Sequence, residues 1–290
     1  MFKRRLKRAW IFLRRLQREL AYDDAMGMAA QIAFYMLLGL FPFLIFLLSV
    51  LSYLPIGQSL QPIMLDALRE QMPVESANYV VSTVLDLLPE QNGRLLSVGL
   101  LASLWAASMA IGALITTINR AYNLRPKRSI VHQKILSIIL TLVLSGIWLF
   151  SLSIILFGPQ VTQAIFEYLG LADESNRLWT NLRLPIAFML SLTALSILYF
   201  YAPEARQKFR WILPGAVTST ILWLLASSLF RVFVRNFGQY NKTYGSLAAV
   251  VILMMWLWIT GLIYLLGAEI NALMQRMEHE EGHRRVRRLD

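Results

Sequence analysis

The chain has 290 residues, of which 57% are hydrophobic and only 16% are charged. This composition excludes an ordinary soluble globular domain and favours an integral membrane protein. The formal net charge is +11 and there are no cysteines, which excludes a disulfide framework, a thiolate metal site and a catalytic thiol.

Residues 1–24 are predicted to form a basic, amphipathic, cytoplasmic helix. The first twenty residues contain eight Lys or Arg residues, and apolar residues recur between them at steps of three and four. The apolar stripe consists of Phe2, Leu6, Ala9, Leu13, Leu16 and Leu20. Such a helix is suited to lie on an anionic leaflet, with its stripe in the headgroup boundary. A nucleic-acid-binding arm is the alternative, but the continuous stripe favours the membrane and no nucleic acid is expected as a partner.

The first apolar span is predicted at residues 29–54. Ala25, Ala29 and Ala33 recur every four residues, and this small-residue face would let another helix approach closely. Pro42 lies in the middle of the span, where it removes one backbone hydrogen bond and is a candidate kink. A packing kink and a hinge that opens a cavity both remain compatible with it.

Residues 55–94 are more polar and rich in acidic side chains, and apolar residues recur there at helical spacing. We expect two amphipathic helices in this segment. They would form an extracytoplasmic cap on the outer membrane surface.

Five further apolar segments complete an all-α integral membrane bundle of six transmembrane helices. The six expected spans are residues 29–54, 95–118, 135–157, 184–201, 212–233 and 247–268. If the N-terminus is cytoplasmic, the segments on that side hold most of the 28 Lys and Arg residues, as the positive-inside rule requires. Both termini are therefore expected in the cytoplasm, with a basic tail at residues 272–290. The whole chain, 1–290, is predicted to be one polytopic domain.

Three blocks of sequence are distinctive: AAQIAFYMLLGLFPFLIFLLSV at residues 29–50, SLWAASMAIGALITTINRAYN at 103–123 and YGSLAAVVILMMWLWITGLIYLLGAEIN at 244–271. These blocks resemble the YihY or BrkB family of bacterial inner-membrane proteins, which carries the older label ribonuclease BN. Together with the hydrophobic segments between them, the resemblance covers nearly the whole chain. It implies a multi-pass protein of the bacterial inner membrane.

No reactive centre is evident in the sequence. His279-Glu280-Glu281-Gly282-His283 matches the zinc pattern H-E-x-x-H, but Gly282 weakens a helix there and a third ligand is not apparent. The paired carboxylate and histidine ligands of metal-dependent nucleases are not visible either. We therefore predict a protein that is not an enzyme, and in particular not a ribonuclease, with no metal and no cofactor.

Polar residues at the cytoplasmic ends of the second and sixth spans are the first candidate site. Asn119 and Arg120 close the second span, and Glu269 and Asn271 close the sixth. An unpaired charge near the membrane boundary is costly, so Arg120 and Glu269 are expected to face one another or a shared polar cavity. Solvation of the helix ends by interfacial water is the alternative. Four aromatic residues are expected to fill the interior of the bundle: Tyr35, Trp105, Tyr122 and Trp148.

A second candidate group lies before the sixth span, at its outer end. Arg231, Arg235, Lys242 and Tyr244 belong to it, and the three cations depart from the inside bias of positive charge. They would bind lipid phosphates or an anionic substrate, or they are ordinary surface charges.

Within the sixth span, Trp256 and Trp258 lie near the middle instead of in an interfacial belt. Residues two apart point to different faces of a helix. At least one of the two indoles is therefore expected to pack inside the bundle.

The expected function is transport or export of an amphipathic anionic lipid or a related metabolite. Anionic headgroups of membrane lipids are the expected partners, and the small-residue faces permit either packing within the chain or a homo-oligomer. No ion-coupling carboxylate is expected in the middle of the membrane. A non-transporting scaffold of the cell envelope is the alternative, followed by a membrane-associated hydrolase.

Overall fold

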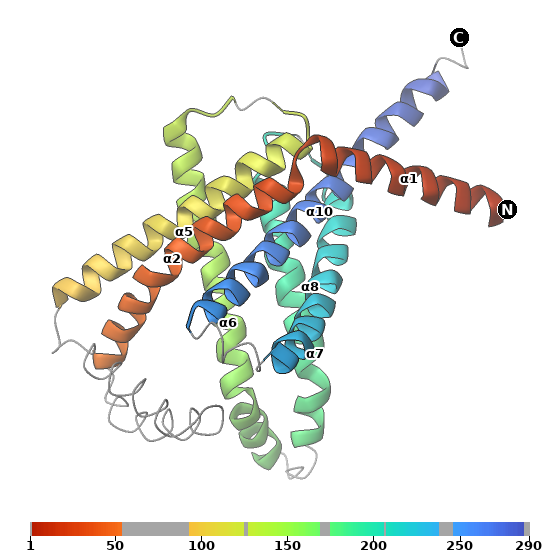
Figure 1. Ribbon diagram of the computed structural model, residues 1–290. Helices are drawn as coiled ribbons and strands as arrows, with labels where there is room; N and C mark the ends of the chain where they lie inside the picture. The colour runs from red at the N-terminus through yellow and green to blue at the C-terminus, as the bar shows by residue number, and fades with distance from the viewer. Residues whose placement is uncertain are drawn as a thin grey trace. The chain divides into compact units, whose positions relative to one another are not determined.

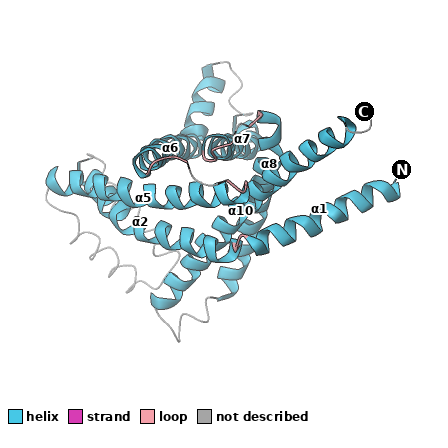
Figure 2. Ribbon diagram, turned by 90° about the horizontal axis from the view of Figure 1, so that it is seen from above, coloured by secondary structure: helices cyan, strands magenta, loops and turns pink. Residues whose placement is uncertain are grey.

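The computed structural model describes residues 2–53, 93–124, 127–168, 175–205, 207–237 and 246–286. Throughout these ranges the chain forms helices and short connections, with no strand (Figure 1, Figure 2). The helices are α1 (Phe2–Tyr22), α2 (Ala25–Tyr53), α5 (Gly93–Ala121), α6 (Ile130–Tyr168), α7 (Ser175–Tyr201), α8 (Phe209–Phe237) and α10 (Ser246–Val286). The predicted all-α class is confirmed for this part of the chain.

Within the described residues, five helices are long and apolar enough to cross a membrane. Their apolar stretches are Ser97–Ala121, Ile130–Ser151, Asn181–Tyr201, Phe209–Val234 and Val250–Glu278. Each has at least 21 residues, and about 20 are sufficient for the hydrocarbon core of a bilayer. In α2 the apolar stretch found in the described residues, Ala25–Leu40, is shorter. The count of six therefore remains a prediction. Residues 55–92 of the expected outer cap lie outside the described residues.

The helix ends follow from local sequence signals. Asp24 has a positive φ of 50° between α1 and α2, and its carboxylate accepts a 3.3 Å hydrogen bond from the backbone N–H of Gly27 at the start of α2. Asn123, with a φ of 54°, ends α5 in the left-handed conformation that Asn tolerates. Before α6, the hydroxyl of Ser129 accepts a hydrogen bond from the N–H of His132. These caps separate consecutive helices without long connections.

Most of the expected basic tail at residues 272–290 is helical, because α10 continues to Val286 and passes through Gly282. One glycine inside a helix costs only about 1 kcal/mol relative to alanine. This extension of α10 also finds a partner, since Glu280 forms a 3.3 Å ion pair with Arg15 of α1.

Contacts divide the chain into two compact units. The first contains residues 1–34 and 111–290, and the second contains residues 35–110. In the first unit α8 packs along α10, α7 packs against both α6 and α8, and α1 packs against α10. In the second unit a Cβ at Gly39 of α2 would lie 3.4 Å from the backbone nitrogen of Ala107 in α5, so these two helices approach closely.

The predicted small-residue face at the start of α2 is confirmed. Ala25, Ala29 and Ala33 are all buried. The neighbour that approaches is α10, because a Cβ added at Gly261 would lie 3.3 Å from the carbonyl oxygen of Ala29. The two backbones are therefore separated by little more than one methyl group.

The closest helix crossing is that of α8 and α10 at Gly215 and Gly267. A Cβ added at Gly267 would overlap Ser219 and Tyr199 and lie 2.8 Å from the carbonyl oxygen of Gly215. The Tyr199 hydroxyl, from α7, donates a 2.7 Å hydrogen bond to the carbonyl of Tyr264 and lies 3.0 Å from the Ser219 hydroxyl. Three helices thus meet at one point that has no room for a side chain on either glycine.

We predict that Gly267→Ala destabilises the protein by about 1–3 kcal/mol, since overpacking forces neighbouring side chains and backbone to shift. Thermal unfolding of the purified chain in detergent, followed by tryptophan fluorescence, measures the effect. Gly146→Ala in α6 is the matched control, because a Cβ there would meet nothing within 4 Å. An equal unfolding midpoint for the two variants would contradict the close crossing.

Candidate functional site

An apolar contact holds α1 against the second half of α10. Leu16 is buried together with Ile270 and Leu273 of α10. Partly buried residues surround this core: Phe12, Leu20, Leu266 and Met277. The sequence analysis assigned Leu16 and Leu20 to a stripe that faces the headgroup boundary, and this is wrong for both, because a protein surface covers them. Leu13, from the same predicted stripe, is exposed.

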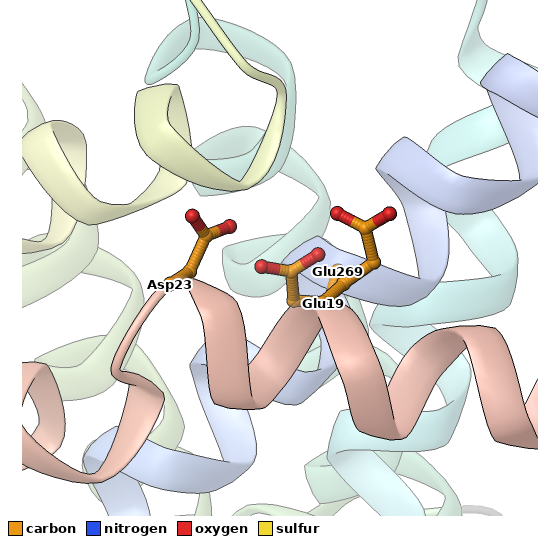
Figure 3. A group of neighbouring side chains, drawn as sticks. All are labelled: Glu19, Asp23 and Glu269. Atoms are coloured by element: carbon orange, nitrogen blue, oxygen red, sulfur yellow. The ribbon is translucent and has the colours of Figure 1, made fainter.

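At the end of this contact, three carboxylates come together. Glu19 lies on α1, Asp23 directly follows α1, and Glu269 lies on α10. Figure 3 shows their carboxyl groups side by side, and one oxygen from each lies within 4.8 Å of the others. Asp23 is 5% exposed and Glu269 is 2% exposed, whereas Glu19 is partly exposed. The spacing of four residues places Glu19 and Asp23 on one face of the chain, toward α10.

Arg276, seven residues after Glu269 on α10, is the cation beside these carboxylates. Its guanidinium lies 3.1 Å from Glu19 and 3.8 Å from Glu269. It also donates a 3.1 Å hydrogen bond to the carbonyl of Ala121, at the end of α5. One side chain therefore connects α1, α5 and α10.

The predicted pairing of Arg120 with Glu269 is wrong. Arg120 is exposed, whereas Glu269 is buried and its ion-pair partner among the described residues is Arg276. Arg120 occupies the last turn of α5, where its side chain extends into solvent. The expectation that a guanidinium lies near the carboxylate of Glu269 was correct. That guanidinium belongs to Arg276, which lies on the same helix as Glu269.

Asn119 and Tyr122 occupy separate positions around the same end of α5. Asn119 is buried, and its side-chain oxygen accepts a 2.8 Å hydrogen bond from the backbone N–H of Glu204. The Glu204 carboxylate in turn accepts hydrogen bonds from the backbone N–H groups of Lys127 and Arg128. This arrangement holds the connection before α6 against the connection after α7.

The hydroxyl of Tyr122 is buried beside the side chain of Gln207, with Glu269 and Arg276 as charged neighbours. Burial raises the pKa of Tyr122 above its ordinary value, which keeps the hydroxyl protonated at any physiological pH. Tyr122 therefore offers a neutral polar group near the carboxylates.

Asn271 is fully buried and supports the crossing of α8 and α10. Its side-chain oxygen accepts a 2.7 Å hydrogen bond from the backbone N–H of Gly215, and its side-chain nitrogen has no hydrogen-bond partner among the described residues. Because Asn271 is two residues from Glu269, the two side chains leave different faces of α10.

The outer candidate group is only partly visible. Lys242 and Tyr244 lie outside the described residues, and Arg235 lies in α8 without a described side chain. Pro42 lies inside α2, as predicted, and its role as a kink remains a prediction.

Sequence reasoning missed Glu19, Asp23 and Arg276. A signal was present, because two acidic residues four apart interrupt the end of an otherwise basic helix. The partner of that acidic pair could not be identified, since Glu269 follows about 250 residues later in the chain.

We predict that Arg276→Gln destabilises the protein by about 1–3 kcal/mol, because it leaves Glu19 and the buried Glu269 without their cation. Arg15→Gln removes the exposed pair with Glu280 and is expected to cost less than about 1 kcal/mol. Thermal unfolding of both variants in detergent provides the comparison. Equal losses would mean that the Arg276 contacts contribute no more than an ordinary surface pair.

Comparisons with known proteins agree with the resemblance seen in the sequence. The family model described as "Virulence factor BrkB" matches residues 16–289. The chain is 33% identical over 265 residues to the "Putative ribonuclease-like protein YfkH" of Bacillus subtilis, an alignment that covers 91% of this chain and 95% of that protein. It is 28% identical over 273 residues to the "UPF0761 membrane protein PBPRA3489" of Photobacterium profundum, with 92% and 82% covered. No solved structure matches the chain. The chain therefore belongs to the Virulence factor BrkB family of membrane proteins.

Proposed function

We propose that this protein is a transporter or exporter that moves an amphipathic anionic lipid or a related metabolite along the interface of α8 and α10. The proposal includes the prediction that the chain is not an enzyme, and it places the protein in the bacterial inner membrane. The observation that carries it is a line of polar groups between these two apolar helices, which we call the polar seam.

The polar seam follows every fourth residue of α8. Its α8 members are Gly215, Ser219, Trp223 and Ser227, and they form one ridge of the helix. The ridge faces α10, because the Trp223 ring lies 5.9 Å from that of Trp256 and the Ser219 hydroxyl donates a 3.0 Å hydrogen bond to the carbonyl of Ile263. Twelve residues of helix span about 18 Å. The seam therefore extends over more than half of the roughly 30 Å hydrocarbon core.

Several polar atoms of the seam are buried without a hydrogen-bond partner in the described part of the chain. They are Nε1 of Trp223, Oγ of Ser227 and Oγ1 of Thr260, with Nδ2 of Asn271 at the other end. An unsatisfied buried polar group costs about 1–3 kcal/mol, so such groups are retained where something else satisfies them. The headgroup of a substrate that passes along the seam would supply hydrogen bonds to these atoms.

Neighbouring hydroxyls on α8 behave differently. Thr220 and Ser228 each donate a hydrogen bond to a carbonyl of their own helix, at 2.8 Å and 3.0 Å. Polar residues that only assist helix packing commonly satisfy themselves in this way. The contrast with Ser227 supports a role for the seam beyond packing, which is the reason to prefer transport over a scaffold.

The same ridge of α8 continues toward cations at its end. Arg231 and Arg235 follow Ser227 at the same four-residue spacing, and Arg231 is exposed. Guanidinium groups pair well with phosphate and carboxylate groups. Their place at one end of the seam supports an anionic headgroup on the substrate.

To test transport, we predict that the purified protein in lipid vesicles accelerates movement of a fluorescent phosphatidylglycerol between leaflets. Ser227→Leu fills the seam with an apolar side chain and should reduce the rate severalfold. Ser228→Leu is the matched control at the exposed neighbouring position, and its rate should equal that of the wild type. If the protein moves none of a broad panel of lipids, the scaffold is the better description.

The contact between α1 and α10 also bears on topology. Leu16 packs on α10 and Arg15 pairs with Glu280, so both described ends of the chain lie on one side of the first unit (Figures 1 and 2). An even number of membrane crossings and a cytoplasmic location of both ends are consistent with this contact and with the Lys and Arg distribution.

Because the chain has no cysteine, single-cysteine variants can test this topology directly. We predict that Gln17→Cys and Glu280→Cys react with a membrane-impermeant maleimide only after the inner membrane of spheroplasts is opened. Asn241→Cys, at the expected outer end of the sixth span, should react in intact spheroplasts. Labelling of only one of the two end positions in intact spheroplasts would exclude a shared cytoplasmic side.

A further inference from the structure

We infer that Glu19, Asp23 and Glu269 form a binding site for a hard divalent cation, with a Ca²⁺-sized ion fitting the present spacing. The inference differs from the absence of a metal site expected from the sequence, and it does not depend on the proposed transport. One oxygen from each carboxylate lies within 4.8 Å of the others, in a group formed by α1 and α10 (Figure 3). Carboxylate oxygens are the preferred ligands of Ca²⁺, Mg²⁺ and Mn²⁺.

Unpartnered oxygens provide a second observation, separate from the proximity of the acids. Asp23 and Glu269 are both more than nine-tenths buried, and Oδ2 of Asp23 and Oε2 of Glu269 have no hydrogen-bond partner in the described part of the chain except the carboxyl groups of each other. The carboxyl groups of Asp23, Glu19 and Glu269 point to the same side (Figure 3). The buried hydroxyl of Tyr122 lies beside Gln207 and has Glu269 among its charged neighbours.

Among the described residues, Arg276 is the cation that contacts this group, through Glu19 and Glu269. With all three carboxylates ionised, the group would carry three negative charges against this single positive charge. The 3.8 Å separation of Arg276 from Glu269 is too long for a hydrogen bond. Two uncompensated charges in a buried position are costly, and a divalent cation would neutralise them.

The spacing is compatible with a Ca²⁺-sized cation. Ca²⁺ binds oxygen at about 2.3–2.6 Å, so ligands on opposite sides of it are up to about 5 Å apart. The three oxygens lie within 4.8 Å of one another, which is inside this limit. Water molecules or the Tyr122 hydroxyl would complete the coordination.

Titration of the metal-stripped, full-length protein in detergent with Mn²⁺, followed by electron paramagnetic resonance, tests the site. We expect one Mn²⁺ bound per chain and displaced by Ca²⁺. Asp23→Asn and Glu269→Gln should each weaken Mn²⁺ binding by about tenfold or more, as is typical when a metal site loses an important group. Asp24→Asn is the matched control, because Asp24 is exposed and asparagine can keep both its positive φ and its bond to Gly27.

Absence of stoichiometric Mn²⁺ binding to the wild-type chain at millimolar concentrations would overturn the inference, and protons would then be the neutralising charges. Mn²⁺ binding by Asp23→Asn and Glu269→Gln that equals binding by the wild type would also overturn the inference. Because a variant at a buried carboxylate can fail to fold, Glu19→Gln at the partly exposed position provides a further variant. The wild-type titration decides the question even without any variant.

Discussion

The close crossing of α8 and α10 is the contact on which the other features of the first unit depend. Two glycines leave room for backbone to meet backbone, and the hydrogen bonds of Tyr199, Ser219 and Asn271 fix the relative position of the helices there. In a membrane, where lipid tails are as apolar as leucine, such close packing and interhelical hydrogen bonds replace the hydrophobic effect as the source of association. With the crossing in place, the polar seam lies on one side of α10.

A different face of α10 carries Glu269, and here the constraint is electrostatic. Glu269 is tolerated in an apolar helix because α1 packs on this part of α10 and because Arg276 is near. The same contact brings Glu19 and Asp23 close to Glu269, which adds negative charge that one guanidinium does not balance. Two of these acids are buried and Glu19 is partly exposed. This concentration of negative charge is the reason for inferring a cation site there.

Helix α1 therefore has two roles that its composition does not separate. Leu16 packs on α10, while Trp10 and Leu13 remain exposed and Arg14 stacks over the Trp10 ring at 5.1 Å. The exposed face keeps the character of a membrane-surface helix, and the packed face forms part of the protein interior. A basic amphipathic sequence is compatible with both environments, since apolar side chains are buried equally well by lipid and by protein.

The sequence by itself determined the helical class, the apolar spans of α5, α6, α7, α8 and α10, and the small-residue face at Ala25, Ala29 and Ala33, because length, hydropathy and helical periodicity are local properties. It also placed one of Trp256 and Trp258 in the interior, and Trp256 does pack against Trp223. The same expectation was wrong for Trp105 and Trp148, which are exposed on the apolar surfaces of α5 and α6. The tertiary structure alone decided that Arg276 and not Arg120 lies beside Glu269, and that Glu19 and Asp23 join them. Pairing between residues 19 and 269 depends on how α1 docks on α10. No local pattern encodes that docking, because the free energy that determines it comes from contacts between segments far apart in the chain.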